Sequence, residues 1–124
     1  MKFKEIINEL REFLIQRDWL NFPAHAVFIH LIEELGEVGK HILFDIEYKT
    51  ESMGHKKPNK HDLQRELAQS FTLLLQLSLI LDVDLEKAWM EELKIMKDRF
   101  PREKLNNVRK ERDLDVSDNE EKTK

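Results

Sequence analysis

Three carboxylates are crowded onto one short stretch of this chain. The segment "EELGEVG" at residues 33–39 puts Glu33, Glu34 and Glu37 within about one helical turn of one another. Like charges four residues apart destabilise a helix by about 0.2–0.5 kcal/mol, so this spacing needs a compensating interaction. Two interpretations follow from the residues alone: a solvated stripe on a surface helix, or a cluster in a cleft that binds a cation.

A fourth carboxylate, Glu66, lies in a second helical pattern. It shares a helix face with Ser70 and Leu73, where a polar helix start passes into an apolar surface. Burying an unpaired carboxylate costs free energy, which a cation or hydrogen bonds would offset. Pairing with Arg65 or with a lysine from elsewhere in the chain is the alternative to a metal ion.

A divalent cation is the ligand that these carboxylates favour. If their two helices pack antiparallel, Glu34, Glu37 and Glu66 are expected to converge. An oxygen-only cluster suits Mg²⁺ or Mn²⁺ better than Zn²⁺, which prefers nitrogen and sulfur ligands. His30 and His41 flank the cluster without forming a His-Glu-x-x-His pattern, so zinc is the weaker interpretation.

The elements that must position these residues are helices. Apolar residues recur at three-and-four spacing, and Pro and Gly are few, so the sequence predicts an all-α chain arranged as a four-helix bundle. Pro23 suits a first helical turn, and Asn59 and Asp84 suit N-caps. The predicted helices cover residues 3 to about 18, 23 to about 46, 59 to about 81 and 84 to about 100. Residues 48–60 are predicted to form a loop, whose lysines suit a solvated linker or long-range attraction of an anion.

Composition narrows the class of protein. The 124 residues predict a single domain over 1–103, followed by a charged segment, 104–124, that is expected to be disordered. A formal net charge of −4 argues against a nucleic-acid partner, and no cysteine is present for a thiolate metal site. Neither a membrane span nor a signal peptide is predicted, so we expect a cytoplasmic protein.

Several motifs together resemble a known family, the all-α nucleoside triphosphate pyrophosphohydrolases of MazG and dCTP pyrophosphatase type. That family carries Glu-Glu-x-x-Glu on one helix and Glu-x-x-Asp on the next. The chain has "EELGE" at 33–37 and "ELAQ" at 66–69, with "RDWLNF" at 17–22 and "VDLEKAW" and "KDRFP" later. The resemblance spans roughly residues 13–103 and is more specific than any single motif.

The resemblance implies a Mg²⁺-dependent enzyme, with Mn²⁺ as an alternative ion, that hydrolyses a nucleoside triphosphate to a monophosphate and pyrophosphate. It implies a helical bundle that is a homodimer or homotetramer. Glu34, Glu37 and Glu66 would be the metal ligands, and Glu33 would position or deprotonate the attacking water. The substrate-binding residues that it suggests are Phe44 and Trp19 at the base, and Lys97 and Arg99 at the phosphates. Core packing for the aromatic pair, and surface solvation for the basic pair, are the alternatives.

The chain departs from the family pattern at one central position. Gln69 stands where the family has the aspartate of Glu-x-x-Asp, so a carbonyl oxygen replaces a charged ligand. Glu92 and Met96 align with a lysine and an asparagine that hold phosphates in relatives, whereas Asp62 could replace the missing charge. The sequence therefore leaves a second hypothesis open: a degenerate relative that binds a nucleotide or a protein partner without hydrolysing it.

Overall fold

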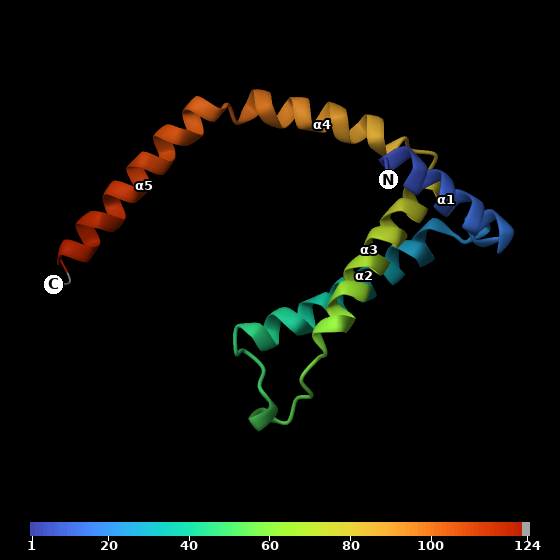
Figure 1. Ribbon diagram of the computed structural model, residues 1–124, viewed down its shortest axis with the longest axis horizontal. Helices are drawn as coiled ribbons and strands as arrows, with labels where there is room; N and C mark the ends of the chain where they lie inside the picture. Colours follow the sequence, from blue (N-terminus) through green and yellow to red (C-terminus); the bar gives the residue numbers. More distant parts are fainter. Residues whose placement is uncertain (123–124) are drawn as a thin grey trace. The chain divides into compact units, whose positions relative to one another are not determined.

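The computed structural model describes residues 1–122, and within them every regular element is helical (Figure 1). The α-helices are α1 (Phe3–Gln16), α2 (Ala24–Asp45), α3 (Lys60–Ile80), α4 (Leu85–Arg99) and α5 (Arg102–Lys122). Two short 3-10 helices, η1 (Trp19–Asn21) and η2 (Glu51–Met53), lie in the connections. The predicted all-α class is confirmed for the described residues.

The breaks between helices follow from local residue chemistry. After α1 the chain reverses at Asp18, which adopts a left-handed conformation with φ of 61°, and Pro23 immediately precedes α2. Asn59 caps α3, since its side-chain oxygen accepts a hydrogen bond from the His61 N–H at 2.9 Å. α4 starts directly after Asp84 and ends before Pro101, as predicted.

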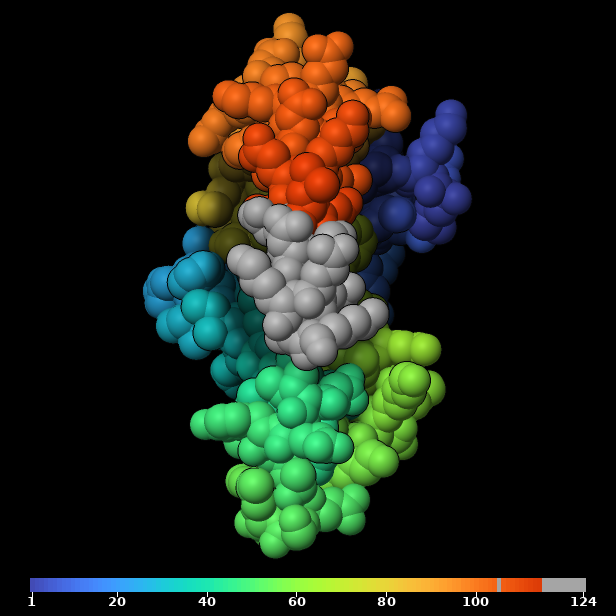
Figure 2. Space-filling view, turned by 90° about the vertical axis from the view of Figure 1, so that its left-hand side faces the viewer, coloured from blue at the N-terminus to red at the C-terminus, as the bar shows by residue number. Residues whose placement is uncertain are grey.

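The central feature of the first part of the chain is an antiparallel hairpin of α2 and α3 (Figure 1). The loop of residues 46–59 joins them at one end, which Figure 2 shows in green. α1 packs on α3 toward the other end of the hairpin. The buried apolar residues come from these three helices: Leu14, Val27, Leu73 and Leu75. The two carboxylate-bearing helices therefore meet the condition, antiparallel packing, on which the expected convergence of the glutamates depends.

The hairpin leaves an apolar stripe of α2 uncovered. Val27 is buried, but five large apolar side chains on the neighbouring face of α2 are each half exposed or more. With 3.6 residues per turn they fall on one stripe of the helix: Phe28, Ile32, Leu35, Ile42 and Ile46. This exposed apolar surface is called the α2 stripe below.

The chain divides into two compact units, and the single domain expected over residues 1–103 stays a prediction. The first unit is Met1–Glu86 and holds the hairpin, whereas the second begins at Lys87 and consists of most of α4 with α5. Residues 102–122, most of which were predicted to be a disordered tail, form α5; residues 123 and 124 lie outside the described residues.

Among the described helices, none alone has the length and apolar character to cross a bilayer, and α3 and α4 would qualify only as a bent pair, by length and composition.

Candidate functional site

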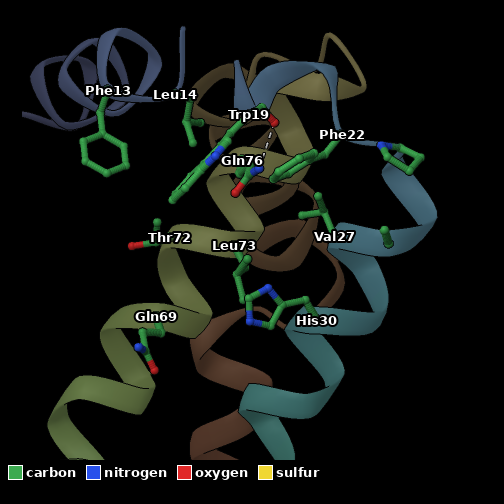
Figure 3. Close-up of a pocket in the computed structure, with 12 residues that line it drawn as sticks. Phe13, Leu14, Trp19, Phe22, Val27, His30, Gln69, Thr72, Leu73 and Gln76 are labelled. Carbon is green, nitrogen blue, oxygen red and sulfur yellow. Dashed lines mark hydrogen bonds between the residues drawn. The ribbon is translucent and has the colours of Figure 1, made fainter. Parts of the chain in front are cut away.

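A pocket of about 620 Å³ opens between α2 and α3 at the end of the hairpin that α1 covers (Figure 3). Its size lies in the range of small-molecule binding sites. The end of α1, the turn that carries η1, the start of α2 and the middle of α3 all contribute to its wall. Its lining residues are Phe13, Leu14, Trp19, Phe22, Pro23, Ala26, Val27, His30, Gln69, Thr72, Leu73 and Gln76.

Aromatic rings form the rim of this pocket. Trp19 meets Phe13 edge to face, with ring centroids 5.8 Å apart, and lies nearly parallel to Phe22 at 6.1 Å. The Arg17 guanidinium sits 3.7 Å above the Phe13 ring and donates to the Phe13 carbonyl, which ties the end of α1 to the turn. The pocket therefore offers flat apolar walls, which suit a planar ring.

One buried amide holds the aromatic turn against α3. The Nε2 of Gln76 donates a hydrogen bond to the main-chain carbonyl of Trp19 at 3.1 Å, across 57 residues of sequence. Gln76 is only 5% exposed, so the bond satisfies part of a polar group that burial would otherwise penalise. The hydrogen bond from Gln76 therefore positions Trp19 through its main-chain carbonyl and not through its side chain.

The pocket becomes polar where it faces the loop end of the hairpin. His30 of α2 and Gln69 of α3 mark that end, and Figure 3 shows them on facing helices. The Thr72 hydroxyl donates to the Ala68 carbonyl at 2.9 Å, so its hydrogen is already used within α3. Gln69 makes no hydrogen bond to any described residue.

Beyond this polar end lie Glu34, Glu37 and Glu66, called the acidic seam below. Each of them contacts a basic side chain of α2. His30 Nε2 is 3.5 Å from a Glu34 carboxylate oxygen, and Lys40 donates to Glu37 at 3.0 Å. His41 Nε2 lies 2.8 Å from Oε2 of Glu66. The pairing of Glu66 with Arg65 or a lysine, raised from the sequence, is replaced by pairing with a histidine.

Glu66 is the most deeply placed of the three carboxylates. Its side chain is 16% exposed and that of His41 is 7% exposed. His41 Nε2 lies beside the buried Oε2 as an ion-pair partner, and this oxygen accepts no hydrogen bond from the described residues. A buried carboxylate oxygen without a hydrogen bond is a suitable ligand for a hard cation, which favours the oxygen-preferring ions over zinc.

The predicted convergence of Glu34, Glu37 and Glu66 is only partial. They lie along one helix pair, yet no three His, Asp or Glu side chains of the described residues are grouped closely enough to hold a metal ion. Glu33 is exposed on α2 and forms no ion pair with another described residue. The assignment of Glu34, Glu37 and Glu66 to a metal site, and of Glu33 to the attacking water, stays a prediction.

The predicted substrate-binding residues are separated in the structure. Trp19 lines the aromatic pocket, whereas Phe44 is half buried near the far end of α2, about 25 Å along the helix from Val27. Lys97 and Arg99 belong to the last turn of α4, in the second unit. The structure therefore brings Trp19, and not Phe44, to the pocket within one chain.

The pocket residues that the sequence did not single out as substrate-binding include Phe13, Phe22 and Gln76. A signal for Gln76 was present, because it is a polar residue in the apolar run "SFTLLLQLSLILDV", where a buried amide needs a hydrogen-bond partner. The two phenylalanines had no comparable signal, because the reversal at Asp18 decides which rings meet.

Comparisons with known proteins give no relative for this chain. No protein-family model, no curated protein and no solved structure matches it. Any assignment of function therefore rests on the residues and their geometry.

Proposed function

We propose that this protein is a Mg²⁺-dependent nucleoside triphosphate pyrophosphohydrolase of the MazG-like type, which acts on the cytoplasmic nucleotide pool. The observation that carries the proposal is that the aromatic pocket and the acidic seam adjoin on one helix pair. His30 belongs to both, since it lines the pocket and contacts Glu34 at 3.5 Å. A flat, uncharged recess beside a row of carboxylates suits a ligand that joins a planar base to a metal-bound polyphosphate.

The distance along the hairpin between the aromatic pocket and the acidic seam is compatible with one extended ligand. From Val27, on the pocket wall, to Glu34 is seven residues, or about 10 Å of helix. Gln69, at the polar end of the recess, follows Glu66 by about one turn of α3. In this proposal the base occupies the pocket and the phosphates extend toward the acidic seam.

The donor set suits Mg²⁺ or Mn²⁺. Glu34, Glu37 and Glu66 would hold the ion, and the buried Oε2 of Glu66, which lacks a hydrogen bond, supports this role. Bound there, the ion would neutralise phosphate charge. Exposed Glu33, one residue before Glu34, would orient the attacking water as its general base. Lys97 and Arg99 are proposed as phosphate contacts.

A nucleotide-binding protein without hydrolytic activity is the second candidate. Two observations favour it: Gln69 has no charge where relatives have an aspartate, and the three seam carboxylates each contact a basic side chain of their own. Such a protein would bind a nucleotide in the pocket without hydrolysing it.

Gln69→Asp separates the two candidates. On purified wild type with Mg²⁺ and a panel of nucleoside triphosphates, we expect measurable pyrophosphate release. In Gln69→Asp we expect it to rise about tenfold or more, because a fourth carboxylate strengthens cation binding. Gln64→Asp, an equal change at an exposed position of α3, is the control and should leave the rate unchanged.

The panel has two other informative results. Release by the variant alone would favour the binding protein as the natural function. If neither protein releases pyrophosphate and neither binds a nucleotide or Mn²⁺, the proposed function is wrong.

We also propose that a second copy of the chain covers the α2 stripe and completes a four-helix bundle. The hairpin supplies two long helices, and the stripe is exposed over almost the full length of α2. Homodimer interfaces are rich in such apolar surface. Two copies packed through their α2 stripes would bury it by symmetry.

Association of two chains through their α2 stripes predicts the mass of the protein in solution. Light scattering coupled to size exclusion should give twice the chain mass of 14.9 kDa or a higher even multiple. Ile32→Lys, in the middle of the stripe, should weaken the dimer at least tenfold, because a lysine charge would be buried in an apolar contact. Ile15→Lys on α1 makes the same change at an exposed isoleucine outside the stripe and should not. A wild type that stays monomeric at high concentration contradicts the proposal.

A further inference from the structure

Gln76 has an acceptor that the fold leaves unused. Gln76 is only 5% exposed, and it lines the aromatic pocket. The recess is also lined by Leu73, on the same helix, and by Val27 of α2, whose side chains carry no hydrogen-bond donor. Whether the amide turns its oxygen or its NH₂ group toward the recess therefore decides which groups of a ligand can form a hydrogen bond with it.

The orientation of this amide is fixed by its partner. A main-chain carbonyl only accepts hydrogen bonds, so the group that faces the Trp19 carbonyl must be the NH₂ of Gln76. The Oε1 atom then points away from the turn and toward the recess, as Figure 3 shows. No group of the described residues donates a hydrogen bond to it.

We propose that Gln76 is a specificity-determining residue, which selects planar heterocycles that present an amino group over those that present an oxo group. This inference rests on the proposed function, because it takes the pocket ligand to be a nucleobase. An amino group donates to Oε1, whereas an oxo group at the same place sets two acceptors against each other and leaves both unpaired. Sites built around a buried polar group discriminate strongly in this way.

The other polar side chains at the recess include His30, Gln69 and Thr72, and His30 already contacts Glu34 at 3.5 Å. The Thr72 hydroxyl hydrogen is used by the Ala68 carbonyl. Gln69 is exposed and has no fixed partner, so its amide can turn to donate or to accept. Gln76 differs because its burial and its bond to Trp19 hold one orientation.

Free nucleosides test the inference without hydrolysis or metal. The protein is the full chain carrying Trp89→Phe, which leaves Trp19 on the pocket rim as the one tryptophan. In buffer with a chelator, its fluorescence is followed on titration with two matched pairs, cytidine against uridine and adenosine against inosine. Within each pair an amino group is exchanged for an oxo group. We expect the amino member of each pair to bind at least about tenfold more tightly.

Gln76→Met identifies the residue responsible. Methionine keeps the length of the side chain but supplies no strong acceptor, so the preference within each pair should fall to about twofold or less. Gln64→Met, at an exposed position of α3, should keep the wild-type preference. If Gln76→Met fails to fold, the wild-type ratios alone decide the matter.

Two results would overturn the inference, and they differ in what else they affect. Equal binding within both pairs, or tighter binding of the oxo members, refutes the role of Gln76 and leaves the proposed hydrolase intact. No binding of any of the four nucleosides refutes both the role of Gln76 and the use of this pocket for a base.

Discussion

Glu66→Gln should lower pyrophosphate release from nucleoside triphosphates at least about 100-fold, the largest effect expected of any single change in the chain. Glutamine has the size and shape of glutamate, so the packing against His41 is retained while the negative charge is removed. The buried Oε2 of Glu66 lies beside His41 Nε2 but accepts no hydrogen bond from the described residues, so a cation bound there is expected to depend on its charge. The rate is measured with saturating Mg²⁺ and substrate.

Binding of Mn²⁺, followed by its electron paramagnetic resonance signal, should weaken at least tenfold in the same variant. Glu12→Gln on α1 removes the same charge from an exposed position and should alter neither quantity. Circular dichroism should give the wild-type helical signal for both proteins. A Glu66→Gln protein that retains wild-type turnover and Mn²⁺ affinity would show that the acidic seam is not the metal site.

The helices of this chain could be predicted because their signals are local. Apolar spacing and the capping residue Asn59 act within one or two turns, and the observed bounds of α2 and α3 differ from the predicted ones by a residue. The division into two units after Glu86 was not predicted. No local pattern in the sequence encodes such a division.

The candidate site, too, has a part that could be predicted from local signals and a part that could not. The sequence placed Glu34 and Glu66 on consecutive helices, which would bring them together only if those helices packed antiparallel. Which basic residue Glu66 contacts could not be predicted, because its pairing with His41 depends on the axial register of two helices joined by a loop of fourteen residues, 46–59. The aromatic pocket was missed for a similar reason: it forms only once the chain reverses at Asp18 and Gln76 bonds the turn.

The α2 stripe illustrates a limit of apolar patterning. Val27 and Phe28 are adjacent and equally apolar, yet one is 4% exposed and the other 50%. Apolar spacing indicates that both faces of α2 avoid water but does not distinguish a face that packs on α3 from one that another copy would cover. The sequence therefore predicted a helix packed on several sides, and the single chain buries only part of it.

Trp19→Ala should weaken nucleotide binding about 10- to 100-fold, because loss of one aromatic surface beneath a base costs about 1–3 kcal/mol and each 1.4 kcal/mol is a factor of ten. The fold should tolerate the change. Trp19 is 41% exposed, and the hydrogen bond from Gln76 reaches its main-chain carbonyl, which alanine retains. Calorimetric titration with the nucleoside monophosphate that the wild type binds best measures the effect without turnover.

Graded substitution distinguishes stacking from a general disturbance of the pocket. Trp19→Phe keeps an aromatic face and should lose about fivefold or less, between wild type and alanine. Trp89→Ala removes the other tryptophan, which is exposed on α4 in the second unit, and should leave the affinity unchanged. Because Phe13 and Phe22 remain in both Trp19 variants, equal losses for Phe and Ala would mean that Trp19 closes the rim by its bulk and does not stack on the base. An unchanged affinity in Trp19→Ala would mean that the nucleotide binds elsewhere on the hairpin.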